Sequence, residues 1–187
     1  LPSVVSESSG LESNTNRNKI WSHNDSGGLP EIYGFDSSGN LLKTIHVINA
    51  INTDWEDVAI DTAGKFFIGD FGNNNNDRHD LRIYLIPNPD TLSDTNVSAQ
   101  IIYFHYPDQA AFPPNNANKN YDVEAFFSLH NSLYLFTKNR DNPFNGYSKL
   151  YKLPATPGIY TAQLIDSFYT GGFSVSIITG ADISPDQ

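Results

Sequence analysis

Short hydrophobic segments, separated by turns rich in Gly, Asn, Asp and Ser, recur along the whole chain. The clearest example covers residues 52–74. It predicts a strand that begins with carboxylates, a tight turn that contains Gly64, and a second strand that runs from Phe66 into an Asp/Asn/Gly loop. Helical periodicity is almost absent. The pattern therefore predicts an all-β fold.

The same order of features occurs three times: an acidic strand start, a turn, an apolar strand and an Asp/Asn/Gly exit, each followed by two further strands. Four-stranded antiparallel units are predicted at residues 6–47, 54–106 and 121–170, and the first strand of another unit at residues 178–187. Repeated units of four short strands are typical of β-propeller blades. An antiparallel sandwich or meander is the alternative, but it gives no reason for the acidic starts to repeat.

A propeller of this length is incomplete. Rings normally close with about four to eight blades, whereas residues 1–187 predict a single domain with three blades and the start of the next. An open arc would expose an unpaired strand edge, which invites aggregation. We therefore expect the remaining blades to come from a longer parent chain or from a neighbouring molecule.

The composition of the chain limits its class and its partners. With 39% hydrophobic and 17% charged residues, the 187-residue chain suits one folded domain. Trp21, Trp55, Phe67 and Leu135 are predicted to form the core between the blades. A net charge of −10 with only 11 Lys and Arg residues opposes nucleic-acid binding, which requires a clustered basic face. The expected partner is a protein or a small neutral ligand.

Scarce and abundant residue types indicate the compartment. The absence of Cys excludes disulfides and thiolate zinc sites. Because the chain has no Met and starts at Leu1, we expect a processed or excised piece of a longer protein. No apolar run reaches the roughly 18 residues of a membrane span, so we expect no membrane insertion. The abundance of Asn, Ser, Thr and Tyr, with the acidic balance, favours a secreted, periplasmic or cell-surface location.

Carboxylate and amide side chains at the strand starts and in the exit loops are the candidates for chemistry. In a propeller the first strand of each blade lines the central channel, so these side chains converge near the axis. The predicted acidic ring contains Glu7, Asp54, Glu56, Asp57, Asp122, Glu124 and Asp182, with Asn24, Asp25, Asp70, Asn73 and Asn139 from the exit loops. Oxygen ligands without sulfur favour Ca²⁺ over zinc.

Six members of this ring are the predicted metal ligands. They are Glu56, Asp57, Glu124, Asn24, Asp70 and Asp182. Glu56 and Glu124 are favoured because Glu is a poor turn former and needs another reason to stand there, and Asp57 is grouped with them. The structural alternative is that Asp and Asn form turns or accept hydrogen bonds from backbone amides of the next blade. The run His-Asn-Asp-Ser at residues 23–26 does not predict a nucleophilic triad, because adjacent strand residues point to opposite faces.

Six short motifs together carry a resemblance to a known family. They are Ser-Gly-Leu at 9–11, Trp-Ser-His-Asn-Asp-Ser-Gly at 21–27, Thr-Asp-Trp-Glu-Asp-Val-Ala at 53–59, Gly-Asp-Phe-Gly-Asn-Asn at 69–74, Asp-Val-Glu-Ala at 122–125 and Thr-Gly-Ala-Asp at 179–182. As a set they resemble secreted bacterial propeller proteins of the wider group of six-bladed NHL-like and gluconolactonase-like propellers. The resemblance implies a six-bladed ring, a parent about twice this long and an exported location. It also implies a divalent cation on the axis, since gluconolactonase-like propellers hold one with Glu, Asn and Asp ligands.

The expected function is that of an exported propeller acting as a binding or scaffold module, with Ca²⁺ near its axis. Two alternatives stay open. One is a metal-dependent hydrolase of the lactonase or phosphoesterase type, in which the cation polarises the substrate and a carboxylate acts as base. The other is a subunit of a larger cell-surface or secretion assembly, whose neighbours would complete the ring.

Overall fold

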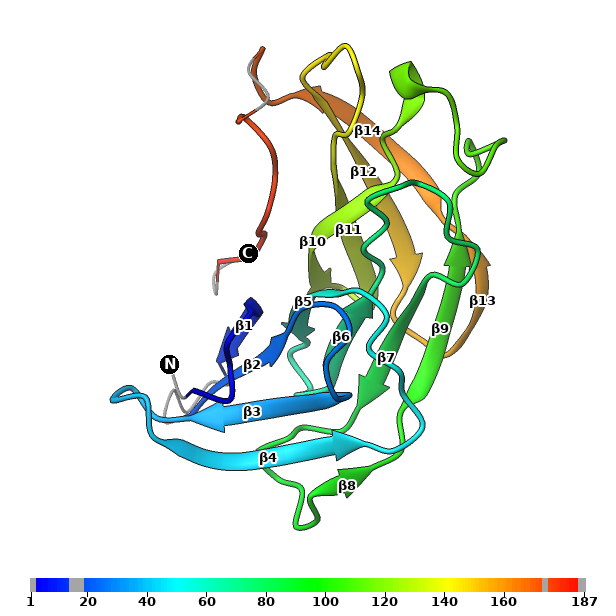
Figure 1. Cartoon of the computed structure of the whole chain (residues 1–187). Coiled ribbons are helices and arrows are strands. Elements are labelled where there is room, and N and C mark those ends of the chain that lie inside the picture. Colours follow the sequence, from blue (N-terminus) through cyan, green and yellow to red (C-terminus); the bar gives the residue numbers. More distant parts are fainter. Residues whose placement is uncertain (1–2, 14–18, 173–174, 185–187) are drawn as a thin grey trace.

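A computed structural model describes residues 3–13, 19–172 and 175–184 of the protein. Within these residues the regular elements are β-strands, apart from one 3₁₀ turn, η1 (Asn116–Asn118). The strands form three sheets that follow one another along an arc (Figure 1). The described part contains no helix that is long and apolar enough to cross a membrane. The predicted all-β class is confirmed.

Each sheet is built on four antiparallel strands taken in chain order. The first sheet contains β1 (Ser8–Ser13), β2 (Ile20–Asn24), β3 (Glu31–Phe35) and β4 (Leu41–Val47). The second contains β5 (Trp55–Ile60), β6 (Phe66–Asp70), β7 (Arg82–Ile86) and β9 (Gln100–His105). The third contains β10 (Asp122–Leu129), β11 (Ser132–Lys138), β12 (Tyr147–Pro154) and β14 (Gln163–Tyr169).

Aspartate side chains stabilise the turns of two hairpins by accepting hydrogen bonds from backbone amides. Between β5 and β6 the carboxylate of Asp61 accepts hydrogen bonds from the amides of Ala63 at 2.9 Å and Lys65 at 2.8 Å. Gly64 has a φ of +83°, which a residue with a side chain rarely adopts. Asp36 has the same role between β3 and β4. Because these bonds are local, the turns were predictable from short stretches of sequence.

Two sheets carry a fifth strand that the sequence did not predict. β8 (Asn96–Val97) lies in the connection from β7 to β9, yet it pairs in parallel with β4 of the first sheet. β13 (Gly158–Thr161) lies in the connection from β12 to β14 and pairs in parallel with β9 of the second sheet. The prediction of purely four-stranded antiparallel units is therefore corrected. Both strands are too short to show a hydrophobic period.

Two hydrophobic cores join the sheets face to face. One lies between the first and second sheets and includes Trp21 and Trp55, which are 1% and 0% exposed. The other lies between the second and third sheets and includes Phe67 and Leu135, which are both fully buried. The predicted core positions are confirmed. The second sheet is thus covered on both faces, and its strand β6 is buried along its whole length.

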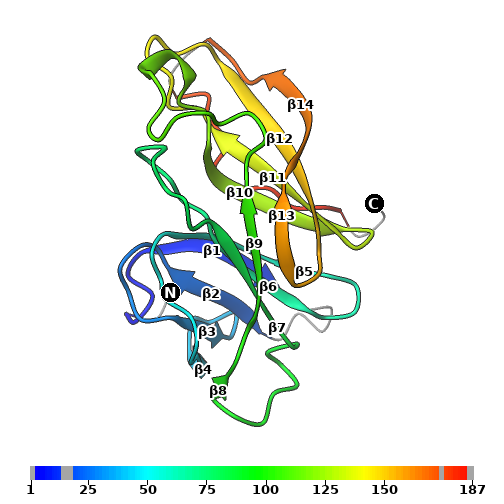
Figure 2. The same ribbon diagram turned by 90° about the vertical axis from the view of Figure 1, so that its right-hand side faces the viewer.

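The first strands of the three sheets lie on the inner side of the arc. β5 contacts both β1 and β10, so the acidic strand starts come close to one another (Figures 1 and 2). Gly10 in β1 makes the approach possible, because a Cβ there would lie 2.6 Å from the amide nitrogen of Val58. The red segment of residues 175–184 lies on the same side of the molecule (Figure 1).

Among the residues that the structure describes, no sheet closes on itself, and residues 175–184 form no strand. The first strand predicted at residues 178–187 is therefore not formed over residues 178–184, which do not pair with any strand in the described part. Residues 185–187 lie outside the described residues. A strand forms only where a neighbouring strand supplies hydrogen-bond partners for its backbone.

Candidate functional site

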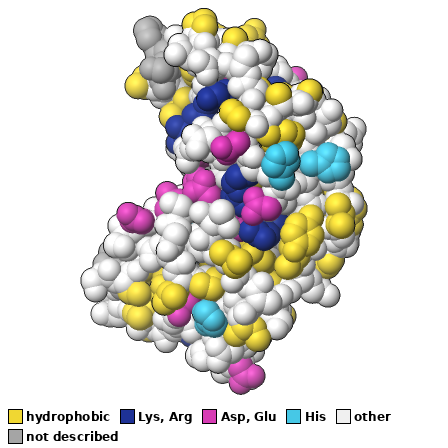
Figure 3. Space-filling model, turned by 45° about the vertical axis from the view of Figure 1, so that its right-hand side comes forward, with side chains coloured by type: hydrophobic (Ala, Val, Ile, Leu, Met, Phe, Trp, Pro, Cys, Tyr) yellow, Lys and Arg dark blue, Asp and Glu magenta, His cyan; other side chains and the backbone are white. Residues whose placement is uncertain are grey.

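Five carboxylates meet at the inner side of the arc. Oxygen atoms of Asp25, Asp54 and Glu56 lie within 4.8 Å of one another, and so do those of Glu56, Asp122 and Glu124. These five residues are called the acidic cluster below. Glu56 belongs to both groups and links them. Figure 3 shows acidic side chains beside Lys and Arg side chains along the hollow of the molecule.

Glu56 and Glu124, the two glutamates of the cluster, each lie at a β-bulge. The pairing of β5 with β6 shifts between Trp55 and Asp57, so that Glu56 is the extra residue of a β-bulge. The pairing of β10 with β11 shifts in the same way between Val123 and Ala125, which makes Glu124 the extra residue there. A bulge re-aims a side chain and often stands next to a functional site. The two glutamates therefore occupy equivalent positions in two successive sheets.

One side of the cluster is neutralised by the protein itself. Arg140 donates to Asp122 at 2.6 Å and to Glu124 at 3.0 Å. Lys138 donates to Glu124 at 2.8 Å, and the amide of Asn73 donates to Asp122 at 2.6 Å. Even so, burial raises the pKa of Glu124. Asp122 and Glu124 thus already have cationic partners.

On the other side of the cluster, Arg78 and Arg140 act on Asp54 and Glu56 through their charge, without a hydrogen bond. Within the described residues no N–H or O–H group donates a hydrogen bond to the side chain of Asp54 or Glu56. Glu56 is only 5% exposed. Burial, followed by the negative charge of Glu124, raises its pKa to about 9, and burial, followed by the charge of Asp25, raises the pKa of Asp54 to about 6. At neutral pH this side needs a proton or a cation.

Gly72 lies directly against the unpartnered pair. A Cβ at this position would lie 2.4 Å from Oδ2 of Asp54 and 2.4 Å from Oε1 of Glu56. Any larger residue would therefore push the two carboxylates away. The glycine leaves room for two carboxylate oxygens at the same place, which is the arrangement that a hard cation requires.

The six predicted ligands are not all in this cluster. Glu56 and Glu124 are brought together, whereas Asp57, Asp70 and Asp182 belong to neither group, and Asn24 directly precedes the cluster member Asp25. Asn24 accepts a hydrogen bond from the amide of Glu7 and donates one to the carbonyl of Val4, so its side chain holds the N-terminal segment.

Asp70 is buried and fully engaged. It accepts hydrogen bonds from Arg78 at 3.0 Å, Arg82 at 2.9 Å and the amide of Asp54 at 3.0 Å. Its side chain is 0% exposed. These contacts satisfy both carboxylate oxygens. Asp70 therefore stabilises the end of β6 and holds the backbone amide of Asp54 in place.

Asp57 joins two sheets. Its carboxylate accepts hydrogen bonds from the amides of Val58 and Phe126, each at 2.9 Å, and Phe126 belongs to β10 of the third sheet. This is the structural alternative considered for aspartates at strand starts. Burial raises the pKa of Asp57 to about 8 and that of nearby Glu12 to about 7. Asp182, which is exposed, adds its charge to both.

Three members of the cluster, Asp25, Asp54 and Asp122, are not among the six predicted ligands. All three belonged to the wider predicted ring. A usable signal was present, because the spacing Asp-x-Glu occurs at residues 54–56 and again at 122–124. The repeated spacing marks an aspartate and a glutamate at corresponding points of two successive units.

His23 is buried and held in its neutral form. Its Nε2 accepts a hydrogen bond from the amide of Gly10 at 3.2 Å, and its Nδ1 lies 2.9 Å from the carbonyl oxygen of Asn24. The proton therefore resides on Nδ1, which donates to that carbonyl. Burial lowers the pKa of His23 to about 4. Because backbone groups engage both nitrogens, the residue has no free nitrogen for catalysis.

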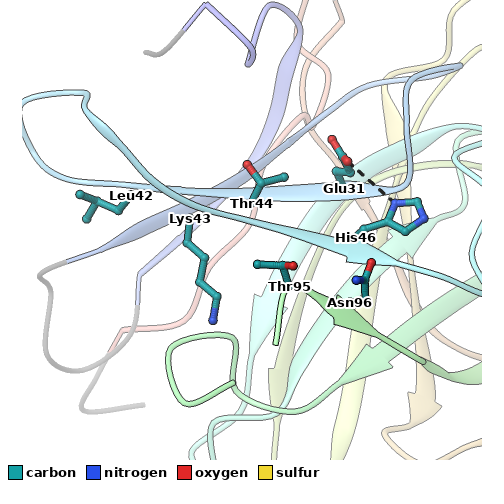
Figure 4. Close-up of a pocket in the computed structure, with 7 residues that line it drawn as sticks. All are labelled: Glu31, Leu42, Lys43, Thr44, His46, Thr95 and Asn96. Atoms are coloured by element: carbon teal, nitrogen blue, oxygen red, sulfur yellow. Dashed lines mark ion pairs between the residues drawn. The ribbon is translucent and has the colours of Figure 1, made fainter. Parts of the chain in front are cut away.

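A shallow groove of about 680 Å³ lies on the outer side of the first sheet, where β8 meets β4 (Figure 4). Glu31 and His46, paired on the adjacent strands β3 and β4, lie side by side at one end of it, with Oε1 and Nδ1 3.9 Å apart. Glu31 also accepts a hydrogen bond from Tyr33, and Lys43 donates to the carbonyl of Leu92. With its charged groups partnered in this way, the groove offers no cluster comparable with that around Glu56.

Neither a protein-family model nor a curated protein matches the chain. The site is therefore interpreted from its own chemistry.

Proposed function

We propose that the chain is part of an exported β-propeller that acts as a binding or scaffold module and holds Ca²⁺ at the acidic cluster. The observation that carries the cation proposal is the buried, unpartnered carboxylate of Glu56, which lies within 4.8 Å of ligand oxygens from both groups. Burying a carboxylate without a donor or a counter-ion is costly. A bound divalent cation would remove this cost.

The propeller architecture is supported by three sheets that pack face to face along an arc with their first strands inside. The motifs that resemble secreted six-bladed propellers fall at equivalent places: the Asp-x-Glu pairs open the inner strands of the second and third sheets. In this proposal the three sheets are consecutive blades. The remaining blades come from a parent chain or from a neighbouring molecule of a larger surface assembly.

The proposed cation lies on the side of Asp25, Asp54 and Glu56. Arg140 and Lys138 already occupy the side of Asp122 and Glu124, and a second cation there would be repelled. Carboxylate oxygens are the ligands that Ca²⁺ prefers, and a flexible ligand set suits Ca²⁺ better than Mg²⁺. The acidic net charge of −10 also favours a cation over an anion.

Calorimetric titration with Ca²⁺ tests the cation site. We expect binding to the wild-type chain and a loss of affinity of at least about tenfold, 1.4 kcal/mol, in Glu56→Gln, since one anionic ligand is removed. Asp94→Asn, which removes the same charge from an exposed loop, should bind like the wild type. Absence of Ca²⁺ binding in the wild type, with no change of stability in chelator, would remove the cation proposal and leave the architecture to be judged separately.

A metal-dependent hydrolase is the second candidate. It is favoured by the acidic cluster itself, in which further carboxylates stand beside the proposed cation and one of them would act as the base. Turnover of a simple lactone or of a phosphate ester in the presence of Ca²⁺, abolished by Asp54→Asn, would support this candidate. Ca²⁺ binding without turnover would favour the binding module.

A further inference from the structure

The outer strands of the first and second sheets are each paired with a fifth strand, and that of the third sheet is not paired in the described part. In the first sheet β4 is covered by β8, with His46 opposite Asn96 and Val47 opposite Val97. In the second sheet β9 is covered by β13 over four residue pairs. Both covering strands are parallel, and both come from the connection between the third and fourth strands of the following sheet. The same device therefore protects two consecutive edges.

The equivalent strand of the third sheet has no such cover. β14 is the last strand of its sheet, and no strand of the described part pairs with its outer edge. Its side chains are exposed: Leu164 by 41%, Ile165 by 43% and Tyr169 by 59%. β14 has no buried residue, whereas the covered strands β4 and β9 each have two, among them Ile45 and Ile102.

Within the described residues, one face of the third sheet also has no neighbouring sheet. A row of aromatic rings crosses it, with Phe127 5.2 Å from Tyr134 and 5.8 Å from Phe136, and Phe136 6.1 Å from Phe168. These four side chains are only partly buried. On the opposite face Leu133 and Leu135 are fully buried against the second sheet. A sheet of this kind is normally apolar only where another layer covers it.

We propose that the third sheet is a docking surface for a further four-stranded β unit, which covers the aromatic row and lays a short extended segment in parallel along β14. The segment is expected to come from the connection between the third and fourth strands of that unit, as β8 and β13 do. Main-chain hydrogen bonds would supply the attachment, as in other cases of strand addition. The docking surface is inferred from the proposed architecture and does not depend on the cation site.

The repeated geometry argues against a second copy of this chain as the occupant. In the described part of a second copy, β8 and β13 are already paired within their own molecule. Two β14 edges related by a two-fold axis would run antiparallel, whereas both existing covers are parallel. Two copies that each carry a charge of −10 would also repel each other.

Hydrogen exchange of the backbone amides tests the docking surface. The probe is a synthetic peptide with the sequence of residues 155–162, which includes β13, added at millimolar concentration to the 187-residue chain in chelator. We expect exchange in β14 to slow at least tenfold, with no change in β4 or β9. The chelator ensures that failure of the cation site cannot imitate failure of the docking surface.

Two variants and a mass measurement sharpen the test. Ile165→Lys, on the open edge, should weaken the protection at least tenfold, because charged side chains on an edge oppose strand addition. Ile159→Lys, in β13 of the chain, where Ile159 is 80% exposed, should leave the protection of β14 by the peptide unchanged. Absence of protection in β14, or protection spread equally over all three outer strands, would overturn the proposal. A concentration-dependent dimer that protects β14 without peptide would also overturn it, in favour of a second copy.

Discussion

Asp70 and Glu56 are two buried acidic residues at the same end of the second sheet, but only Asp70 has hydrogen-bonded partners for its carboxylate. The carboxylate of Asp70 is contacted by Arg78 and Arg82, and both of its oxygens are satisfied. The carboxylate of Glu56 receives no hydrogen bond from the described residues and has a pKa raised to about 9. The protein thus neutralises one charge internally and leaves the other for a proton or an external cation.

The difference separates a structural carboxylate from a candidate ligand. A buried ion pair is costly to break, because the remaining charges lose their partner. An unpartnered buried carboxylate lowers stability unless something binds it. Substitutions at the two positions should therefore have opposite effects on the ligand-free protein.

The largest effect is expected for Asp70→Asn. Both Arg78 and Arg82 would lose a buried carboxylate, and we expect the free energy of unfolding to fall by about 3–5 kcal/mol. Urea denaturation measures this loss, which Ca²⁺ should not specifically restore. Asp80→Asn is the matched control, because Asp80 contacts the same two arginines but its side chain is 51% exposed. Its loss should stay within about 1 kcal/mol, and equal losses in the two variants would contradict the distinction.

A smaller effect is expected for Asp57→Ala. The substitution leaves the buried amide of Phe126 without its acceptor, which costs about 1–3 kcal/mol. Urea denaturation should show this loss, while calorimetry should show a Ca²⁺ affinity within about twofold of the wild type. A collapse of Ca²⁺ affinity with unchanged stability would instead identify Asp57 as a ligand.

Gly72→Ala should act on the cation site more than on the fold. The new Cβ meets the flexible ends of Asp54 and Glu56 and would push them apart. We expect Ca²⁺ affinity to fall about tenfold, 1.4 kcal/mol, in a calorimetric titration. Gly28→Ala is a suitable control, because its Cβ would find no atom closer than 3.6 Å. If both variants bound Ca²⁺ like the wild type, the cation would have to lie away from Gly72.

A further effect concerns the pH dependence of stability in chelator. The pKa of Glu56 rises from 4.5 to about 9 on folding, so the folded state binds more protons between these values. The contribution of Glu56 to stability is therefore fully present at low pH and is lost as the pH rises towards about 9. Glu56→Gln should reduce the slope by up to about 1.4 kcal/mol per pH unit, as measured by denaturation across this range. Asp54, Glu12 and Asp57, whose pKa values are also raised, contribute to the remaining slope, and an unchanged slope would contradict the burial of an unpartnered Glu56.

Local pattern allowed much of the fold to be predicted. The hairpins depend on turn residues a few positions apart, such as Asp61 and Gly64, and the strands on alternating hydrophobic residues. β8 and β13 were missed because their pairing is with another sheet and nothing in their own short sequences specifies it. Non-local pairing of this kind leaves no periodic signal.

The candidate site was predictable only in part. Glu56 and Glu124 stood out because Glu is unusual at a strand start, and the structure brings them together. The position of Asp70 in an exit loop predicts a metal ligand. In the structure, Arg78 and Arg82, which follow later in the chain, form ion pairs with it. The bulges at Glu56 and Glu124 involve register between strands, which the residue types did not reveal. Charge compensation and register both depend on partners that only the folded chain identifies.

Proton release on Ca²⁺ binding tests the central claim most directly. At pH 8 the carboxyl group of Glu56, with a pKa of about 9, is mostly protonated, and a cation that binds it must displace that proton. Calorimetry in two buffers of different ionisation enthalpy counts the protons released. We predict about one proton per Ca²⁺ for the wild type and for Asp94→Asn, and none for Glu56→Gln. Ca²⁺ binding to the wild type without proton release would show that the ion does not bind Glu56 and would contradict the account.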